Sequence, residues 1–307
     1  MDIKYSTTNN GETYLKMLVG SQTYTIRGYS RAGLRTSILI DEINVVFDMG
    51  YANDRAFSFD NKLISHGHTD HIGALYTDYC ARQLYNVNKP NLIIMPKQCI
   101  NPYKMISSAI SEMNCGKSGN NIKIFSSIKN ASIMESELCE SEYVKLINNG
   151  KSELYVKSFI MDHKIKSYGY IIYRKSRKLK PEYIGLTSSD IISFKKKIGE
   201  QNITYEIFTP LVGYTGDTSI TGVIKYDEFL TVPLLIMECT GFSDDDCCDC
   251  CTGKHIHVND LTLNHYLFEN NKIVLFHFSQ QYKQIDQILE YCNSIPESFK
   301  NKLLFFF

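Results

Sequence analysis

Three of the eight histidines of the chain fall within six residues, in the segment Ser-His-Gly-His-Thr-Asp-His at 65–71. Imidazole and carboxylate groups are good zinc ligands, and the segment follows an apolar run that predicts a strand. Because alternate residues that leave a strand can point to different sides, His66 and His68 can hold one metal ion. Asp70 and His71 can then hold a second, and Gly67 permits the tight backbone that this requires. The spacing therefore predicts a site for two metal ions.

Further candidate ligands follow other predicted strands. His163 closes a strand-like segment, Asp217 follows the strand-like residues 208–212 beside a glycine, and His277 ends the apolar run 272–276. A lone histidine after a strand is usually structural. Together with the cluster, however, these three residues complete the ligand sets of two metal sites.

The elements that must position these residues alternate along the chain. Short β-branched or aromatic runs predict strands, and apolar residues at helical spacing predict helices. The predicted strands cover 44–47, 62–65, 91–95, 153–160, 168–173, 234–237 and 272–276, and the predicted helices cover 72–81 and 283–291. This alternation is typical of a layered α/β protein, in which functional side chains follow strand ends.

The 307 residues are 43% apolar, which suffices for a substantial core. Lys plus Arg and Asp plus Glu both number 33, and this balance disfavours nucleic-acid binding unless the basic residues cluster. They do cluster between 174 and 201, at Arg174, Lys175, Arg177, Lys178, Lys180, Lys195, Lys196 and Lys197. This segment is either a solvated loop or a surface for phosphate groups.

The polar N-terminus and the lack of a run of about 20 apolar residues favour a soluble, intracellular protein without a membrane partner. The ten cysteines are then expected to be free thiols. The run Cys247-Cys248-Asp249-Cys250-Cys251 lacks the spacing of a zinc knuckle, so we expect an exposed, dispensable loop there. The other cysteines are expected to be buried or half-buried, and His265 to lie on a helix surface.

The ligand series resembles the motifs of the metallo-β-lactamase superfamily, with Asp48 as its first, usually structural, aspartate. Within that superfamily, three segments resemble the ribonuclease Z family: 30–37, Met-Glu-Cys-Thr at 237–240, and His-Phe-Ser-Gln-Gln-Tyr at 277–282. Residues 168–170 and 181–186 resemble its short, plant-type members. The resemblance implies an αββα sandwich of two mixed sheets flanked by helices. It also implies one domain over 1–307, with 174–201 as a reduced tRNA-binding arm.

The resemblance also implies the chemistry of the site. It implies two Zn²⁺ per chain, one held by His66, His68 and His163, the other by Asp70, His71 and His277, with Asp217 bridging them. A hydroxide would attack the phosphodiester after the discriminator base of precursor tRNA, oriented by Asp70. His255, aligned by Glu238, would protonate the leaving oxygen, although His257 remains an alternative. Such enzymes usually work as homodimers in which the arm of one subunit reaches tRNA at the other.

Two competing interpretations remain. Other two-zinc hydrolases of the fold, acting on different phosphodiesters or on esters, share the ligands but not the Glu238 and His255 pair or the basic segment. A non-catalytic RNA-binding scaffold would have no need of seven ligands. The residue before Glu238 is Met237, where bacterial ribonucleases Z often carry histidine.

Overall fold

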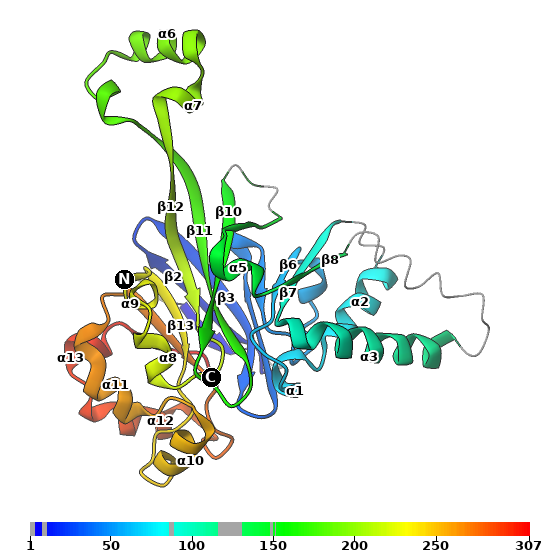
Figure 1. Cartoon of the computed structure of the whole chain (residues 1–307). Helices are drawn as coiled ribbons and strands as arrows, with labels where there is room; N and C mark the ends of the chain where they lie inside the picture. Colours follow the sequence, from blue (N-terminus) through cyan, green and yellow to red (C-terminus); the bar gives the residue numbers. More distant parts are fainter. Residues whose placement is uncertain (1–3, 8–10, 86–88, 116–130, 148–149, 151) are drawn as a thin grey trace.

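A computed structural model describes residues 4–7, 11–85, 89–115, 131–147, 150 and 152–307, and it shows two mixed sheets packed face to face (Figure 1). The first sheet holds β1 (Lys4–Thr7), β2 (Thr13–Val19), β3 (Gln22–Arg31), β4 (Arg35–Ile40), β5 (Val45–Phe47), β6 (Asn61–Leu63), β7 (Asn91–Met95) and β8 (Ala131–Glu135). The second holds β9 (Val144–Lys145), β10 (Glu153–Met161), β11 (Ser167–Leu179), β12 (Thr204–Tyr214), β13 (Leu234–Glu238), β14 (Lys272–Phe276) and β15 (Leu303–Phe305).

Helices cover the outer face of each sheet (Figure 1). Those beside the first sheet are α1 (Thr69–Ile72), α2 (Leu75–Leu84) and α3 (Lys97–Cys115). Short α5 (Leu138–Ser141) precedes β9, and the second sheet is covered by α8 (Ile220–Ile224), α9 (Asp227–Thr231), α10 (Asp246–Gly253), α11 (Val258–Asn264), α12 (Ile285–Tyr291) and α13 (Glu297–Lys300). The expected αββα sandwich of two mixed sheets is thus confirmed.

Each sheet has an antiparallel half and a parallel half. Strands β5 to β8 run parallel in the first sheet, and β12 to β15 run parallel in the second. Several of these strands, among them β5, β13 and β14, are almost continuous apolar runs because both of their faces are covered. Parallel strands end at a common edge, so the residues after β5, β6, β12, β13 and β14 can gather there.

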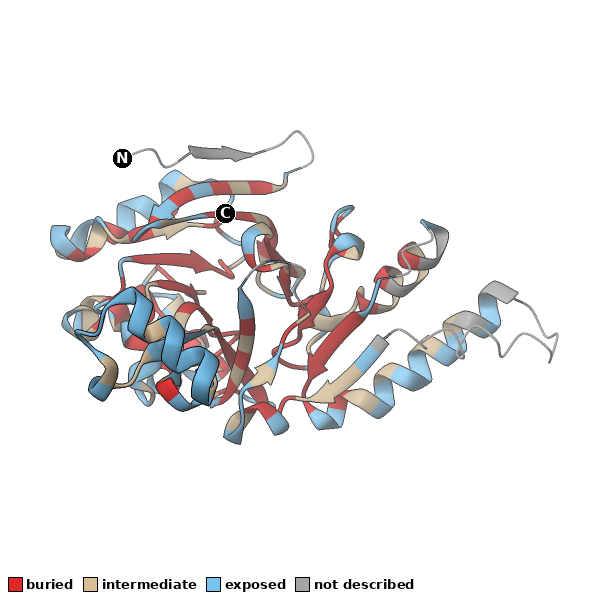
Figure 2. Ribbon diagram, turned by 90° about the horizontal axis from the view of Figure 1, so that it is seen from above, coloured by how far each residue is buried: buried red, intermediate tan, exposed pale blue. Residues whose placement is uncertain are grey.

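The core between the sheets is rich in aromatic side chains. Tyr214 stacks on Phe47, with ring centroids 4.6 Å apart, and on Phe276, 5.1 Å apart. Separate apolar clusters lie under the helices of each sheet, and Figure 2 shows the buried residues gathered in the strands. Buried tyrosines need partners for their hydroxyl groups, and here Tyr214 donates its hydrogen bond to Asp48. The core therefore reaches directly into the edge where the candidate ligands lie.

The basic segment forms most of a projecting arm rather than a loop. Strands β11 and β12 extend as an antiparallel pair out to Leu179 and Thr204, so the sequence expectation that both strands lie outside 174–201 was wrong. The tip holds α6 (Ser188–Ile198) and α7 (Glu200–Ile203), and it stands clear of the sandwich (Figure 1). The pairing register shifts between Ile172, which pairs with Val212, and Tyr173, which pairs with Pro210, and this shift marks a bulge near the base of the arm.

The cysteine-rich segment is also different from the expected loop. It forms helix α10, in which Cys247, Cys248 and Cys251 are exposed while Cys250 is buried. Asp246 holds the start of this helix by accepting hydrogen bonds from the backbone N–H groups of Phe242 and Ser243. Asp246 also accepts a hydrogen bond from the hydroxyl of Tyr282, so local and tertiary contacts together stabilise a helix that the propensities of Asp, Cys and Thr disfavour.

The expected burial of the other cysteines agrees with the described residues. Cys80 is half-buried and Cys99, Cys139, Cys239 and Cys292 are buried, while the side chain of Cys115 lies outside the described residues. Within the described part of the chain, no helix combines the length and the apolar character needed to cross a membrane.

Candidate metal centre and acid–base pair

The seven predicted ligands lie together at the edge where the parallel strands end. The loop after β6 carries His66, His68, Asp70 and His71, the last two within α1. The other three follow strands of the second sheet: His163 after β10, Asp217 after β12 and His277 after β14. The site therefore spans both sheets.

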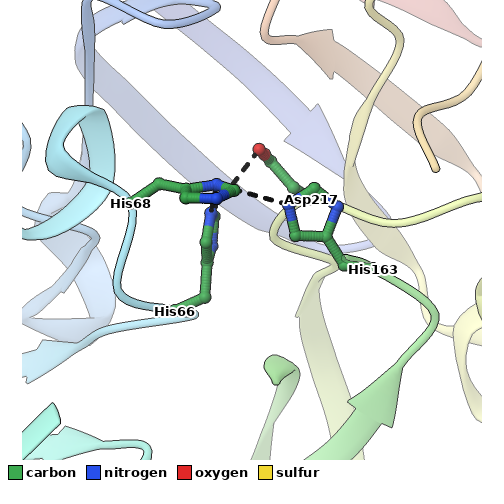
Figure 3. A group of neighbouring side chains, drawn as sticks. All are labelled: His66, His68, His163 and Asp217. Atoms are coloured by element: carbon green, nitrogen blue, oxygen red, sulfur yellow. Dashed lines mark hydrogen bonds and ion pairs between the residues drawn. The ribbon is translucent and has the colours of Figure 1, made fainter. Parts of the chain in front are cut away.

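The first group of side chains consists of His66, His68, His163 and Asp217, whose ligand atoms all lie within 4.8 Å of one another. Figure 3 shows them converging from three separate segments of the chain. Nδ1 of His68 lies 2.9 Å from Nε2 of His66 and 3.3 Å from Nε2 of His163. Three ring nitrogens at this spacing around one carboxylate match the nitrogen and oxygen ligands of a zinc site.

The second group consists of Asp70, His71 and His277. The Nε2 atoms of the two histidines lie 3.2 Å apart, and each is 3.4 Å from Oδ2 of Asp70. Oδ2 of Asp217 lies 3.3 Å from both of these nitrogens and 3.7 Å from Nε2 of His66. Asp217 therefore occupies the boundary between the two groups.

The environment of Asp217 is a further sign that these residues suit a bound cation. Oδ1 of Asp217 is buried and has no hydrogen-bond partner among the described residues. A buried carboxylate oxygen without a partner is costly, whereas a cation among the converging nitrogens would satisfy it. The donor set of imidazoles and carboxylates suits a divalent metal such as zinc.

Asp48 orients two of the ligand histidines. Its carboxylate accepts a hydrogen bond from Nδ1–H of His71 at 2.7 Å and from the hydroxyl of Ser65 at 2.8 Å. Because that hydroxyl gives its only hydrogen to Asp48, Ser65 accepts from Nδ1–H of His66, 2.9 Å away. In their neutral forms both histidines thereby present Nε2 lone pairs to the cluster. We call Asp48, Ser65, His66 and His71 the Asp48 network.

Glu238 is fully buried at the end of β13 and accepts four hydrogen bonds. Its Oε1 accepts from the backbone N–H of Thr218 and from Nδ1–H of His255, both at 2.8 Å. Its Oε2 accepts from the hydroxyl of Thr240 at 2.8 Å and from the backbone N–H of Ile256 at 3.3 Å. Both oxygens are therefore fixed, and so is the ring of His255.

The Glu238 carboxylate also fixes a metal ligand through Thr240. Since the Thr240 hydroxyl donates to Glu238, it must accept from Nδ1–H of His277, 3.0 Å away. This leaves the Nε2 lone pair of His277 facing the second group. We call Glu238, Thr240, His255 and His277 the Glu238 network.

His257 is bound elsewhere, which separates it from its neighbour His255. Its Nε2–H donates to the carbonyl of Ser243 at 2.8 Å, and its Nδ1 accepts from the backbone N–H of Asn259 at the start of α11. The ring of His255 instead lies against His163 and His277, with centroids 5.1 and 5.3 Å away. Of the two histidines, His255 is the one that faces the cluster.

Two site residues adopt a left-handed backbone conformation. Asp48 has φ 58° and His277 has φ 68°, each directly after a parallel strand. Such conformations cost about 1–3 kcal/mol for non-glycine residues and persist only where the surroundings hold them. Gly50 permits the close approach there, because a Cβ at this position would lie 1.6 Å from the carbonyl oxygen of Asp70.

The electrostatics of the cluster differ from ligand to ligand. Burial lowers the pKa of His66 well below its ordinary value. Burial also acts to lower the pKa of His71, but Asp217 and Asp48 outweigh it and raise that pKa well above normal. Burial would raise the pKa of Asp217, yet the surrounding His277 and His71 hold it well below normal. The carboxylate is thus anionic at neutral pH and available to a cation.

The pKa of His255 is shifted in the direction that a proton donor needs. Burial lowers it, but the negative charge and hydrogen bond of Glu238 outweigh burial and raise the pKa from 6.5 to about 9. The imidazole is therefore protonated at neutral pH. It can hold a proton at Nε2, the ring atom that does not contact Glu238.

Sequence reasoning did not single out three further contributors. Ser65 and Thr240 each set the tautomer of a neighbouring histidine, and the backbone N–H of Gly33 donates to Oδ2 of Asp70 at 2.8 Å. Their position in the sequence was the available signal, because Gly33 and Thr240 lie inside segments that resemble the ribonuclease Z family and Ser65 begins the histidine cluster.

Comparisons with known proteins bear on the identity of the chain. No family model matches it. It is 31% identical over 283 residues to tRNase Z TRZ1 of Arabidopsis thaliana, an alignment that spans 91% of this chain and 94% of that protein.

Solved structures share its fold. The metallo-β-lactamase fold protein YhfI of Bacillus subtilis is 14% identical and matches with a TM-score of 0.51, covering 90% of this chain and 92% of its own. The short form of human tRNase Z is 17% identical and matches with a TM-score of 0.50, covering 83% and 92%. The fold is therefore the metallo-β-lactamase fold, and the similarity to the Arabidopsis protein shows that this chain belongs to the tRNase Z family of ribonucleases.

Proposed function

We propose that the chain is an endoribonuclease that removes the 3′ trailer of precursor tRNA by cutting after the discriminator base, with two zinc ions bound. Family membership supports the substrate class. The observation that carries the proposal is the pairing of His255 with buried Glu238 directly beside the His and Asp cluster.

The ligand sets follow the two groups of side chains. His66, His68 and His163 would hold one zinc ion, and Asp70, His71 and His277 the other, with Asp217 between them. When bound, the two ions would lower the pKa of a water molecule and neutralise negative charge on the reacting phosphate. Asp70 would orient the attacking water, since its pKa is held below normal against burial by hydrogen bonds from His277 and His71.

His255 would move the second proton of the reaction. Its Nε2 holds a proton at neutral pH because Glu238 stabilises the charged ring. Donation of this proton to the leaving 3′ oxygen would give tRNA with a free 3′ hydroxyl and a trailer with a 5′ phosphate. Four hydrogen bonds fix the Glu238 carboxylate, so His255, which is bound to it, is positioned before substrate binds.

The arm would hold the body of the tRNA. Residues 174–206 carry eight basic and four acidic side chains, although the whole chain is neutral. Glu206 pairs with Lys175 and Arg177, and Glu200 pairs with Lys195. Among the described residues, Lys178, Lys196 and Lys197 have no such acidic partner, and they remain available to phosphates.

The direction of the arm favours a homodimer. Strand β11 leaves the metal edge at Ser167 and runs 13 residues to Leu179, a rise of about 40 Å. The tip therefore lies far from the site of its own chain (Figure 1), and it would contact RNA that is bound at a second subunit. Sedimentation of the purified protein tests this, and a strict monomer in the presence of tRNA would contradict it.

The direct test is incubation of the purified protein with an end-labelled, 3′-extended precursor tRNA, followed by mapping of the new ends. We expect a cut immediately after the discriminator base, and no cut by the Asp70→Ala variant. A zinc-loaded protein that leaves the RNA intact would instead point to another phosphodiester or ester substrate at the same centre. A protein that folds without metal and only binds the RNA would be a scaffold.

A further inference from the structure

A cavity of about 440 Å³ lies beside the metal-binding loop, between α1 and α2 on one side and α3 on the other. Its walls include Gly67, Thr69, Tyr76, Cys99, Tyr103 and Ile106. The volume is in the range of sites that hold small organic groups, and most of the lining is apolar or aromatic. None of the steps proposed above uses this cavity.

The cavity and the metal site share one loop. Along residues 66–70, His66, His68 and Asp70 turn toward the cluster, whereas Gly67 and Thr69 line the cavity. A Cβ at Gly67 would lie 3.1 Å from Sγ of Cys99, so the loop packs closely on the first turn of α3. A group in this cavity is therefore adjacent to whatever the metal ligands hold.

The chemistry of the walls fits a nucleobase. Two tyrosines can stack on a base of any identity, and Ile106 is 53% exposed although it lines the cavity. Gln98, on the first turn of α3, donates a hydrogen bond to the carbonyl of Lys166 at 3.4 Å, which brings the loop 163–167 to the cavity. This loop carries exposed Lys164, which can face a phosphate.

The position of His255 indicates which of the two nucleotides beside the scissile phosphate can place its base in the cavity. His255 follows α10, on the side of the second sheet, whereas α2 and α3 lie on the side of the first sheet (Figure 1). The leaving 3′ oxygen, with the discriminator nucleoside, must face His255. The scissile phosphate stays with the next nucleotide, which therefore extends away from His255, toward the cavity.

We propose that this cavity binds the base of the first trailer nucleotide, the one that retains the phosphate after cleavage. The inference rests on the proposed cleavage of precursor tRNA, and it makes Tyr76, Tyr103 and Ile106 contacts to the product that leaves. The cavity would hold the trailer in register, so that the reacting phosphate lies over the metal ligands.

The test compares two precursor tRNAs that differ only in whether the first trailer nucleotide carries a base or is abasic. For the wild-type protein we expect KM to be about tenfold lower for the RNA with the base, since stacking on aromatic side chains is of that order. Ile106→Asp should raise KM about tenfold for that RNA and leave the abasic RNA almost unchanged.

Met105→Asp is the matched control, because Met105 is adjacent on α3, is 72% exposed and does not line the cavity. It adds the same charge and should leave both KM values unchanged. If wild-type protein cuts both RNAs with equal KM, or if Ile106→Asp weakens both equally, the cavity does not bind this base. If wild-type protein cuts neither RNA, the cleavage proposal itself fails, which is a separate outcome.

Discussion

The Asp48 and Glu238 networks have the same hydrogen-bond arrangement, one on each sheet. In each, a buried carboxylate binds one histidine directly and a second through a hydroxyl, Ser65 in one case and Thr240 in the other. The Asp48 network turns both of its histidines toward the metal groups. The Glu238 network turns only His277 there and keeps His255 protonated. The difference shows how one arrangement can serve either metal binding or proton transfer.

The largest effect is expected at Asp217, where the two networks meet. Asp217→Asn removes a charge from the boundary between both metal groups, and we expect zinc affinity to fall by more than about 100-fold, because outer partners of ligands alone contribute about 10–100-fold. Equilibrium dialysis against buffered zinc measures this. An unchanged content of two zinc ions at low free zinc would contradict the bridging position.

Asp48→Asn should break the metal-binding network alone. The amide that replaces the carboxylate would carry no negative charge, and its nitrogen cannot accept a hydrogen bond, so Ser65 and His71 would no longer both be held. Zinc affinity should therefore fall by about 10–100-fold. Activity should return when excess zinc is added, while the pH dependence of kcat stays as in the wild type. Loss of activity that zinc cannot restore would mean that Asp48 acts in some other way.

Glu238→Gln should break the proton-transfer network. The folded-state pKa of His255 is raised to about 9, so the protonated donor is present below that pH and is lost as pH rises through it. Removal of the charge lowers this pKa, and the alkaline limb of kcat should move to lower pH, with kcat reduced about tenfold at neutral pH. Asp48→Asn is the control, since its alkaline limb should not move.

Removal of the Ser65 or the Thr240 hydroxyl is expected to give the smallest effects, and it tests most closely how the two networks differ. Ser65→Ala and Thr240→Val each remove the hydroxyl that fixes one ligand histidine, and the lost hydrogen bond of that histidine is worth about 1 kcal/mol, so zinc affinity should fall by about fivefold in each. Only Thr240→Val also frees a Glu238 oxygen, and only this variant should change the pH profile. Identical profiles for the two variants would show that Thr240 does not link the two functions.

Much of this arrangement could be predicted from the sequence because the ligands follow apolar strands. His163, Asp217 and His277 each follow such a run, and this pattern predicted a layered α/β protein with its site at strand ends, whereas the two mixed sheets were implied by the family resemblance. The tautomers of the histidines could not be predicted, since they depend on two hydroxyl groups. Ser65 donates to Asp48, 17 residues earlier in the chain, and Thr240 donates to Glu238, two residues earlier. Spacing does not show where a hydroxyl hydrogen points.

Two elements differed from expectation for physical reasons. The strands of the arm lack an apolar face because no core covers them, so Arg174 to Leu179 looked like loop. Helix α10 forms through hydrogen bonds that Asp246 accepts from the backbone just before the helix and from the hydroxyl of Tyr282, not through propensity. Its C-terminal end matters to the site, since the backbone N–H of His255 donates to the carbonyl of Cys250 at 2.9 Å.

The most direct test of the account asks whether His255 protonates the leaving oxygen. His255→Ala is assayed on two precursor tRNAs, one normal and one with sulfur replacing the 3′ bridging oxygen at the cut, since a thiolate leaves without a proton. If His255 is the proton donor, we expect activity to fall by about 10²–10⁴-fold on the normal RNA, with nearly full activity on the sulfur RNA and unchanged zinc content. An equal loss on both RNAs would contradict the assignment.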